Sequence, residues 1–262
     1  MPGPVYLITP EFSEVVLDAA IFVTSTAAGT AKANLVKPQP TDIWRAGGLG
    51  IHNIDIDLTT AKAVACAALL FTSLETGTTF TVTAGATQGA ATYTSGAITL
   101  AAFEGEADTP RRHLIHIPAT PQTYRWWRFA IAAQSTAFTA GNVVLGPAWQ
   151  PDAEYSMSIG GSVGGDLVTT DGGNLIAAAP WREMAPEIDL NILATTEAIH
   201  EEKMQRLLRL RAVRKPVLLA RDLSTANYTQ QRVVWGYIAD MTPTVLTNLN
   251  FWKWRVRVSG MI

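Results

Sequence analysis

Between residues 51 and 148 the chain is a succession of short apolar runs separated by Gly, Thr, Ser and Pro, and this pattern limits the folds it can adopt. Each run is long enough for one β-strand and is bounded by turn-forming residues. Seven or eight strands at this spacing predict a β-sandwich, and we favour the jelly-roll version. The candidate strands are IHNIDIDL, AVACAALLF, TTFTVTAG, AITLAAF, RHLIHIP, YRWWRFAI and NVVLGP.

The strand YRWWRFAI, residues 124–131, carries four aromatic and two arginine side chains. Side chains alternate between the two faces of a strand, so the sequence predicts which of them lie together. The predicted faces are Arg125, Trp127, Phe129 and Ile131 on one side, and Tyr124, Trp126, Arg128 and Ala130 on the other. Both faces are bulky. The strand is therefore predicted to lie between a core and a second covering layer, or to present aromatics to a partner.

The composition favours a folded protein with extensive subunit contacts. The chain has 262 residues, enough for two domains of ordinary size. Only 16% of the residues are charged, against roughly 25% in typical soluble domains. The net charge of −2 argues against nucleic acid and against an anionic membrane surface as partners. The start of the chain lacks the pattern of a secretory signal, and no run of 18 apolar residues occurs, so we expect a soluble protein made in the cytosol.

The second half of the chain has a different composition. The segment Gly160 to Asn174 is glycine-rich and predicts a flexible loop or linker. The segment Thr195 to Val213 predicts one helix, with glutamates at its beginning and arginines at its end, as the helix dipole favours. Its predicted apolar face holds Ile199, Met204, Leu207, Leu208 and Leu210. A β pattern then returns in PVLLARDL, RVVWGYIADM and FWKWRVRVSG.

The last of these runs, residues 251–260, again alternates. Its two predicted faces are Trp252, Trp254, Val256 and Val258 on one side, and Phe251, Lys253, Arg255 and Arg257 on the other. The predicted organisation is an N-terminal strand over residues 1–11, a jelly roll over 12–150, a glycine-rich linker over 151–180 and a second, mainly β domain with one packed α-helix over 181–262. The whole chain is thus predicted to be mainly β.

Candidate metal ligands are few. His113 and His116 are three residues apart and are predicted on opposite faces of a strand, so no zinc site is expected. Cys66 lies among small apolar residues and is predicted to be buried. One face of the first candidate strand is predicted to carry the side-chain oxygens of Asn53, Asp55 and Asp57. These oxygens could hold Ca²⁺ together with carbonyls from a loop, or the face could be the solvated side of a sandwich strand.

No catalytic signature occurs in the sequence, and we expect no enzyme, no cofactor and no metal. The acidic cluster of Glu104, Glu106 and Asp108 could supply paired carboxylates for glycoside cleavage, or could be an ordinary polar turn. Aromatic side chains could instead stack on sugar rings. The candidates for stacking are Trp44, Trp126 and Trp149.

The series TDIWRAGG, IHNIDIDL, AVACAALLF and TTFTVTAG, followed by YRWWRFAI and NVVLGPAWQP, resembles a galactose-binding-like jelly-roll module found in tail proteins of tailed bacteriophages. The C-terminal part, with its glycine-rich stretch, helix, KPVLLARD, RVVWGYI and closing aromatic-basic strand, is similar to tail-tip components related to distal tail proteins. The resemblance extends from Thr41 to the end of the chain.

This resemblance implies a structural virion protein at the tail tip, assembled in the cytoplasm of the bacterial host. Residues 181–262 would then form a tail-tube-like ring domain, with the strand in residues 1–11 as a further member of its sheet. The implied partners are other copies of the chain in a sixfold or threefold ring, the tail tube protein, and tail hub or baseplate proteins. The domain order departs from that of common distal tail proteins, in which the ring domain comes first.

Two other functions are compatible with the sequence. The first alternative is a carbohydrate-binding tail module for adsorption to host glycans, with Trp44, Trp126 and Trp149 as stacking residues. The second is a glycan-cleaving enzyme. Low charge, abundant small residues and aromatic strands favour an assembly subunit over both, because large obligate interfaces are more apolar than ordinary surface.

Overall fold

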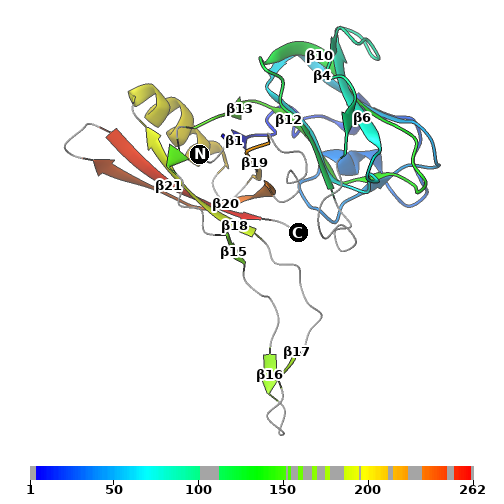
Figure 1. Cartoon of the computed structure of the whole chain (residues 1–262). Helices are drawn as coiled ribbons and strands as arrows, with labels where there is room; N and C mark the ends of the chain where they lie inside the picture. Colours follow the sequence, from blue (N-terminus) through cyan, green and yellow to red (C-terminus); the bar gives the residue numbers. More distant parts are fainter. Residues whose placement is uncertain are drawn as a thin grey trace. The chain divides into compact units, whose positions relative to one another are not determined.

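The chain is mainly β and divides into two compact units, as seen in a computed structural model (Figure 1). Unit 1 comprises Met1–Pro151 and Pro216–Val233, and unit 2 comprises Asp152–Lys215 and Val234–Ile262. The structure describes residues 4–100, 112–151, 153–154, 159–161, 167–169, 175–177, 186–194, 196–211, 215–223, 232–246 and 251–260. Within these ranges no helix is long and apolar enough to cross a membrane. The domain limits drawn from the sequence stay a prediction.

A six-stranded antiparallel sheet forms one layer of the jelly roll in unit 1. Its order is β2-β4-β10-β6-β7, and β8 also pairs with β6. The bounds are β2 Ile21–Val23, β4 His52–Val64, β10 Gln122–Ile131, β6 Thr79–Gly85, β7 Tyr93–Thr94 and β8 Ile98–Thr99. The predicted strand AITLAAF is described only as far as Leu100, and its remainder lies outside the described residues.

The opposing layer is a three-stranded antiparallel sheet in the order β12-β5-β9. Its strands are β12 Asn142–Gly146, β5 Cys66–Thr72 and β9 Arg112–His116. Every side chain of β5 and β12 is buried, including Cys66. A strand with no exposed face is covered on both sides. The covering layer that the sequence predicted for YRWWRFAI is therefore found at this sheet and not at β10, whose outward side chains are partly exposed.

Short strands complete unit 1. Strand β3 (Trp44–Arg45) pairs with β11 (Thr139–Ala140), and β1 (Val5–Ile8) pairs with β13 (Ala148–Trp149) and with β19 (Val217–Arg221). Two 3₁₀ turns, η1 (Asp18–Ala20) and η2 (Lys32–Val36), lie between β1 and β3. The strand predicted in residues 1–11 is thus paired with a strand that follows the helix in the sequence.

The core of unit 1 lies between the two sheets. Alternating side chains of β4, β6 and β10 meet those of β5, β9 and β12. The largest buried members are Trp44, Trp127, Phe129, Phe138, Ile54, Ile56 and Leu69. Burying one such side chain contributes about 1.5–3 kcal/mol, so this cluster is the main source of stability for the jelly roll.

An irregularity in the pairing of β10 with β4 changes the predicted faces of YRWWRFAI. The register shifts between Tyr124 and Trp126, and Thr59 on β4 has a φ of 63°. Trp127 and Phe129 point into the core as predicted, but Arg125 is exposed, whereas Tyr124 packs against the core. The predicted positions of Tyr124 and Arg125 were therefore wrong, because a bulge interrupts strict alternation.

Unit 2 also consists largely of antiparallel strands. Strand β18 (Pro186–Ala194) pairs with β21 (Phe251–Gly260), β14 (Ala153–Glu154) and β15 (Ile159–Gly161), and β20 (Val233–Leu246) pairs with β21. Among the described residues, strands β16 (Leu167–Thr169) and β17 (Leu175–Ala177) pair with each other and form a separate two-stranded sheet. The predicted alternation of the last strand is confirmed for Trp254, Val256 and Val258, which are buried.

The helix of unit 2 begins with a π-helical segment, η4 (Ile199–Gln205), and continues as α1 (Arg206–Arg211). Its buried side chains are His200, Met204, Leu207 and Arg211. Leu210, predicted on the apolar face, is 48% exposed. The π segment has more residues per turn than an α-helix and so rotates the face that points inward. On that face, the Nε1–H of buried Trp254 donates to Nδ1 of His200 over 3.1 Å.

Candidate functional site

The outer surface of the six-stranded sheet carries a cluster of aromatic and charged side chains, which we call the Trp126 face. Its members are Phe22, Asp55, Asp57, Gln88, Arg125, Trp126 and Arg128. They come from β2, β4, β10 and the turn after β6. Because Ile54 and Ile56 point into the core, alternation places Asp55 and Asp57 on the opposite side of β4, as the sequence predicted.

Asp55 and Arg128 form a bidentate ion pair across β4 and β10. The Nε–H of Arg128 donates to Oδ1 of Asp55 over 2.5 Å, and an Nη2–H donates to Oδ2 over 2.8 Å. The side-chain amide of Gln88 donates to the same Oδ2 over 2.9 Å. Asp55 is buried, whereas Arg128 keeps part of its guanidinium in contact with solvent. The carboxylate therefore fixes the orientation of an accessible donor group.

Asp57 and Arg125 repeat this arrangement one row further along the sheet. Nε and Nη2 of Arg125 each donate to Asp57 over 2.6 Å, and the backbone N–H of Thr59 adds a third bond. The hydrogen bonds from Arg125 lower the pKa of Asp57 below its ordinary value and raise that of Arg125. The bonds to Asp55 likewise raise the pKa of Arg128. Asp57 and both arginines are therefore charged at neutral pH.

Two aromatic rings lie beside these ion pairs. The rings of Phe22 and Trp126 are 5.5 Å apart between centroids, at an angle of 44°. The guanidinium of Arg125 lies 5.6 Å from the Trp126 ring, and the Nζ of Lys32 lies 5.7 Å from the Phe22 ring. Phe22 is 39% exposed and Trp126 is half-buried. The Trp126 face thus combines a reachable apolar surface with oriented N–H donors.

The structure separates the three tryptophans predicted to stack on sugars. Trp44 is fully buried, and its Nε1–H donates to Oγ1 of Thr26 over 3.1 Å, so its assignment as a stacking residue was wrong. The reason is that the Trp44 ring packs edge-on against Phe138 inside the core. Trp149 is half-buried on β13, in the register opposite Leu7 of β1. Of these three tryptophans, Trp126 is the one that belongs to the cluster on the outer surface of the six-stranded sheet.

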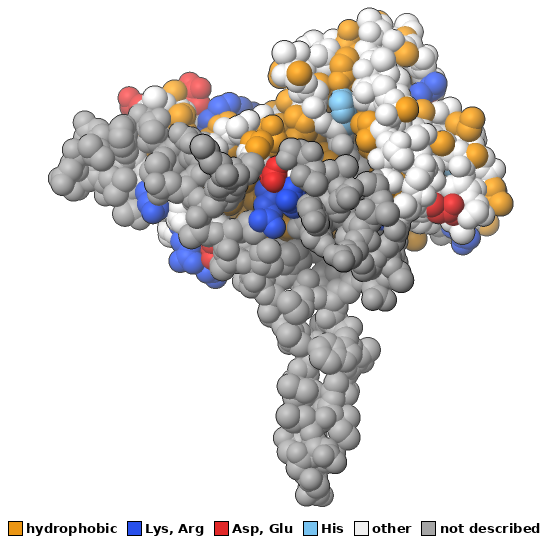
Figure 2. Space-filling model, in the orientation of Figure 1, with side chains coloured by type: hydrophobic (Ala, Val, Ile, Leu, Met, Phe, Trp, Pro, Cys, Tyr) orange, Lys and Arg blue, Asp and Glu red, His pale blue; other side chains and the backbone are white. Residues whose placement is uncertain are grey.

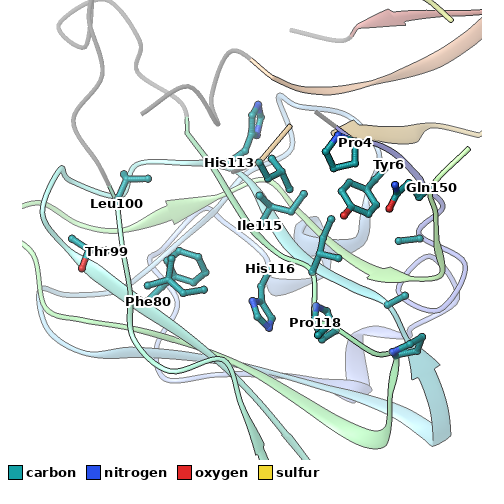
Figure 3. A pocket seen from close by; sticks show the side chains of 17 residues that line it. Pro4, Tyr6, Phe80, Thr99, Leu100, His113, Ile115, His116, Pro118 and Gln150 are labelled. Carbon is teal, nitrogen blue, oxygen red and sulfur yellow. The ribbon is translucent and has the colours of Figure 1, made fainter. Parts of the chain in front are cut away.

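A cavity of about 720 Å³ lies elsewhere in unit 1, beside β9, and we call it the β9 cavity. Figure 3 shows Ile115 and His116 of β9 between two groups of lining residues. One group comes from β6, β8 and the residue after β8, and includes Phe80, Thr99 and Leu100. The other comes from the N-terminal segment and from the chain around β13, and includes Pro4, Tyr6 and Gln150.

Both histidines of β9 line the β9 cavity. Their rings point in opposite directions in Figure 3, as the sequence predicted, and both can line one cavity because β9 is at the edge of its sheet. The Nε2 of His116 is hydrogen-bonded to the hydroxyl of Tyr93 over 2.6 Å. The Nδ1 of His113 accepts from the backbone N–H of Phe71 over 3.3 Å. Loss of hydration lowers the pKa of His116 and lowers that of His113 to about 4.

The other chemical candidates from the sequence have different outcomes. Among the described residues no group of three or more His, Cys, Asp or Glu side chains is arranged to hold a metal ion. Asp55 and Asp57 bind arginines, so the suggested Ca²⁺ site with Asn53 is not formed. Burial raises the pKa of the Cys66 thiol. The cluster of Glu104, Glu106 and Asp108 lies outside the described residues.

Sequence reasoning missed the β9 cavity and both ion pairs. Part of the signal for the ion pairs was present, because β4 carries two carboxylates at alternating positions and β10 carries two guanidinium groups. Their pairing depends on the register of two strands about 70 residues apart, which the pattern alone does not contain. Residues from seven separate segments line the cavity, and no local motif joins them.

No family model matches this chain, and no curated protein sequence matches it. Several solved structures are similar to about half of it. Chitosan-binding module 1 of a Paenibacillus sp. IK-5 chitosanase/glucanase is 14% identical, with a TM-score of 0.37 over 48% of this chain and 93% of the module. The module CBM32-3 of a family 31 glycoside hydrolase from Clostridium perfringens is 17% identical, with a TM-score of 0.39 over 52% and 97%.

The family 32 CBM of NanJ from C. perfringens, solved in complex with galactose, is 11% identical, with a TM-score of 0.41 over 55% of this chain and 99% of the module. At these identities and TM-scores, the assignment of fold and function depends on the geometry of the chain itself.

Proposed function

We propose that this protein binds carbohydrate on the Trp126 face. The observation that carries the proposal is the half-buried Trp126 ring, which lies against exposed Phe22 and beside two arginines that carboxylates hold in place. A sugar ring has an apolar C–H surface and a rim of hydroxyl groups, so it needs an aromatic platform and fixed hydrogen-bonding groups together.

The proposed role of each side chain in sugar binding follows from its exposure. A guanidinium has five N–H groups, and Asp55 or Asp57 takes two of them in each pair. The other N–H groups of Arg125 and Arg128 are the donors to sugar hydroxyls, and the carboxylates neutralise the positive charge. Trp126 supplies the stacking surface. The two ion pairs restrict the arginine rotamers before the sugar arrives, which lowers the entropic cost of binding.

The test is a glycan array with the intact chain, followed by calorimetry with the best-bound oligosaccharide. Trp126→Ala is expected to weaken binding at least tenfold, because truncating an aromatic anchor at a binding site typically costs more than about 1.4 kcal/mol. Trp149→Ala is the matched variant, since Trp149 is also half-buried in unit 1. Unchanged affinity in Trp126→Ala, or a loss confined to Trp149→Ala, would overturn the proposed site.

A second function, that of a ring-forming virion protein at a phage tail tip, is supported by unit 2 and by the apolar surface. β18, β20 and β21 form a sheet of long antiparallel strands with one helix, and β16 and β17 form a separate two-stranded ribbon. Figure 2 shows many hydrophobic side chains and few charged ones on the visible, coloured part of unit 1. Exposed large apolar side chains, typical of interfaces, are Val15, Leu17, Phe22, Leu49, Ile51 and Leu210. The comparisons give this second function no support.

Light scattering tests the ring function directly. A ring subunit is expected to form a homo-oligomer, sixfold in the proposal and threefold as the alternative, and to occur in purified tails. Replacing exposed Leu210 by Glu is expected to dissociate an oligomer that uses this helix. A protein that stays monomeric at high concentration and is absent from virus particles would rule out this function and leave the carbohydrate proposal untouched.

A further inference from the structure

We propose that the β9 cavity is a second binding site, and that it takes an uncharged molecule in which an aromatic or aliphatic body carries hydroxyl or amide groups. This inference is independent of the carbohydrate proposal, because no residue of the Trp126 face lines the cavity. At about 720 Å³, the cavity lies within the roughly 300–1,000 Å³ that small-molecule sites typically occupy.

The chemistry of the described lining favours uncharged ligands. None of the described residues that line the cavity is Asp, Glu, Lys or Arg. An ion bound there would lose part of its hydration without gaining a counter-charge from these residues, which is unfavourable. Apolar side chains such as Phe80, Ile98, Leu100 and Ile115 offer contact to an aromatic or aliphatic body.

The polar groups of the lining are neutral and come from different segments. They belong to Tyr6, Thr99, His113, His116 and Gln150. A phenol, a hydroxyl, an amide and two imidazoles can each exchange hydrogen bonds with a hydroxyl or an amide of a ligand. A few polar groups set in an apolar lining are what fixes the orientation of a small molecule in a protein site.

Contacts outside the cavity fix both imidazoles in position. The Phe71 N–H donates to Nδ1 of His113, so a neutral His113 carries its proton on Nε2. Tyr93 of the opposite sheet holds His116 through a 2.6 Å hydrogen bond. Loss of hydration lowers the pKa of both rings, which keeps them uncharged at neutral pH. Two immobilised, neutral imidazoles are suited to a neutral ligand and give an anion no cation to pair with.

The probes for the test are N-acetyltyrosine amide and N-acetyltyrosine. Both carry a phenol ring and an amide, and at pH 7.5 only the second carries a charge, so they isolate the predicted selectivity without using a sugar. Calorimetry with the full chain is expected to show saturable binding of the amide, at least tenfold tighter than that of the carboxylate. Equal binding of the two, tighter binding of the carboxylate, or no binding of either at millimolar concentration would overturn the proposal.

Variants locate the binding. Ile115→Trp narrows the cavity and is expected to weaken binding of the amide at least tenfold, whereas Leu49→Trp adds the same indole at an exposed position and is expected to leave it unchanged. Thr99→Val deletes one lining hydroxyl at nearly constant shape, and a severalfold loss is expected even if Ile115→Trp fails to fold. Unaltered affinity in Thr99→Val, or equal effects of the two Trp variants, would refute the location. Failure here leaves glycan binding by the Trp126 face standing.

Discussion

Acidification is expected to destabilise unit 1 through His113. The His113 ring packs edge-on against Phe71, with centroids 5.0 Å apart, and its Nδ1 accepts the Phe71 N–H. Protonation at Nδ1 would place a second proton in that hydrogen bond and a charge at a poorly hydrated position. The pKa of His113 is therefore about 4 in the folded chain, whereas an exposed histidine has a pKa of about 6.5.

The sign and size of the effect follow from linkage. Between pH 6.5 and pH 4 the unfolded chain binds a proton that the folded chain does not, so stability is complete above pH 6.5 and falls as the pH decreases toward 4. The pKa difference corresponds to roughly 3 kcal/mol when the whole range is crossed. Between pH 8 and pH 5 the expected loss is about 2 kcal/mol. His116, whose pKa is also lowered, adds to the loss in the same direction.

Urea unfolding followed by tryptophan fluorescence at pH 8, 6.5 and 5 measures this loss. His113→Gln is the informative variant, because it removes the titrating group and keeps an acceptor oxygen for the Phe71 N–H. Its loss of stability between pH 8 and pH 5 is expected to be smaller than that of the natural sequence by about 2 kcal/mol. If both proteins lose stability equally over this range, the assigned environment of His113 is wrong.

Three further perturbations test the packing of unit 1. Asp55→Asn is expected to cost roughly 1.5–3 kcal/mol in urea unfolding, because it weakens a charge-assisted pair with Arg128; a cost near zero would contradict the pairing. Gly146→Ala would place a Cβ 1.8 Å from a backbone oxygen and is expected to prevent folding of unit 1, whereas Gly48→Ala, in open space, should leave the melting temperature nearly unchanged. Trp44→Ala is expected to cost roughly 3–5 kcal/mol, and a loss below about 1 kcal/mol would show that the ring is not buried.

Periodicity predicted the strands of the jelly roll well, because half-buried strands record their environment as alternation. The run TTFTVTAG at residues 78–85 corresponds to β6 (Thr79–Gly85), and NVVLGP at 142–147 corresponds to β12 (Asn142–Gly146). In β6 the apolar residues Phe80, Val82 and Ala84 face the core, whereas β12 is buried along its whole length and was predicted from its continuous apolar run. The same reasoning placed Asn53, Asp55 and Asp57 on one face of β4.

The elements that sequence reasoning missed or misplaced depend on interactions between distant residues. At Arg125 the register of the two strands shifts, because four residues of β4 lie opposite a single residue of β10. The sequence of neither strand alone shows this. Strand β18 was missed, although Ile188, Leu190 and Ile192 alternate along it. The helix of unit 2 was predicted as an α-helix with Leu210 on its apolar face. Its π-helical segment rotates that face, so that His200 is buried and Leu210 is exposed.

The two candidate sites also differed in how far they could be predicted. Trp126 was a candidate from its residue type and place in an aromatic strand, but the same evidence suggested Trp44, which is buried. An aromatic side chain in a β-sandwich has the same sequence signature whether it points into the core or toward the outer surface. Register and burial separate the two, and these are properties of the fold.

The ion pairs and the lining of the β9 cavity both reflect the cost of removing a charged group from water. Charged groups are stable at a protein surface only where water or a partner compensates them, and β4 and β10 bring their opposite charges together on the open side of a sheet. The described residues that line the β9 cavity, in contrast, include no charged side chain apart from its two histidines, whose pKa values are lowered. The jelly roll therefore offers two recognition surfaces of opposite character. Oriented guanidinium donors mark the first, and uncharged hydrogen-bonding groups mark the second, so ligands are expected to distinguish between them by charge.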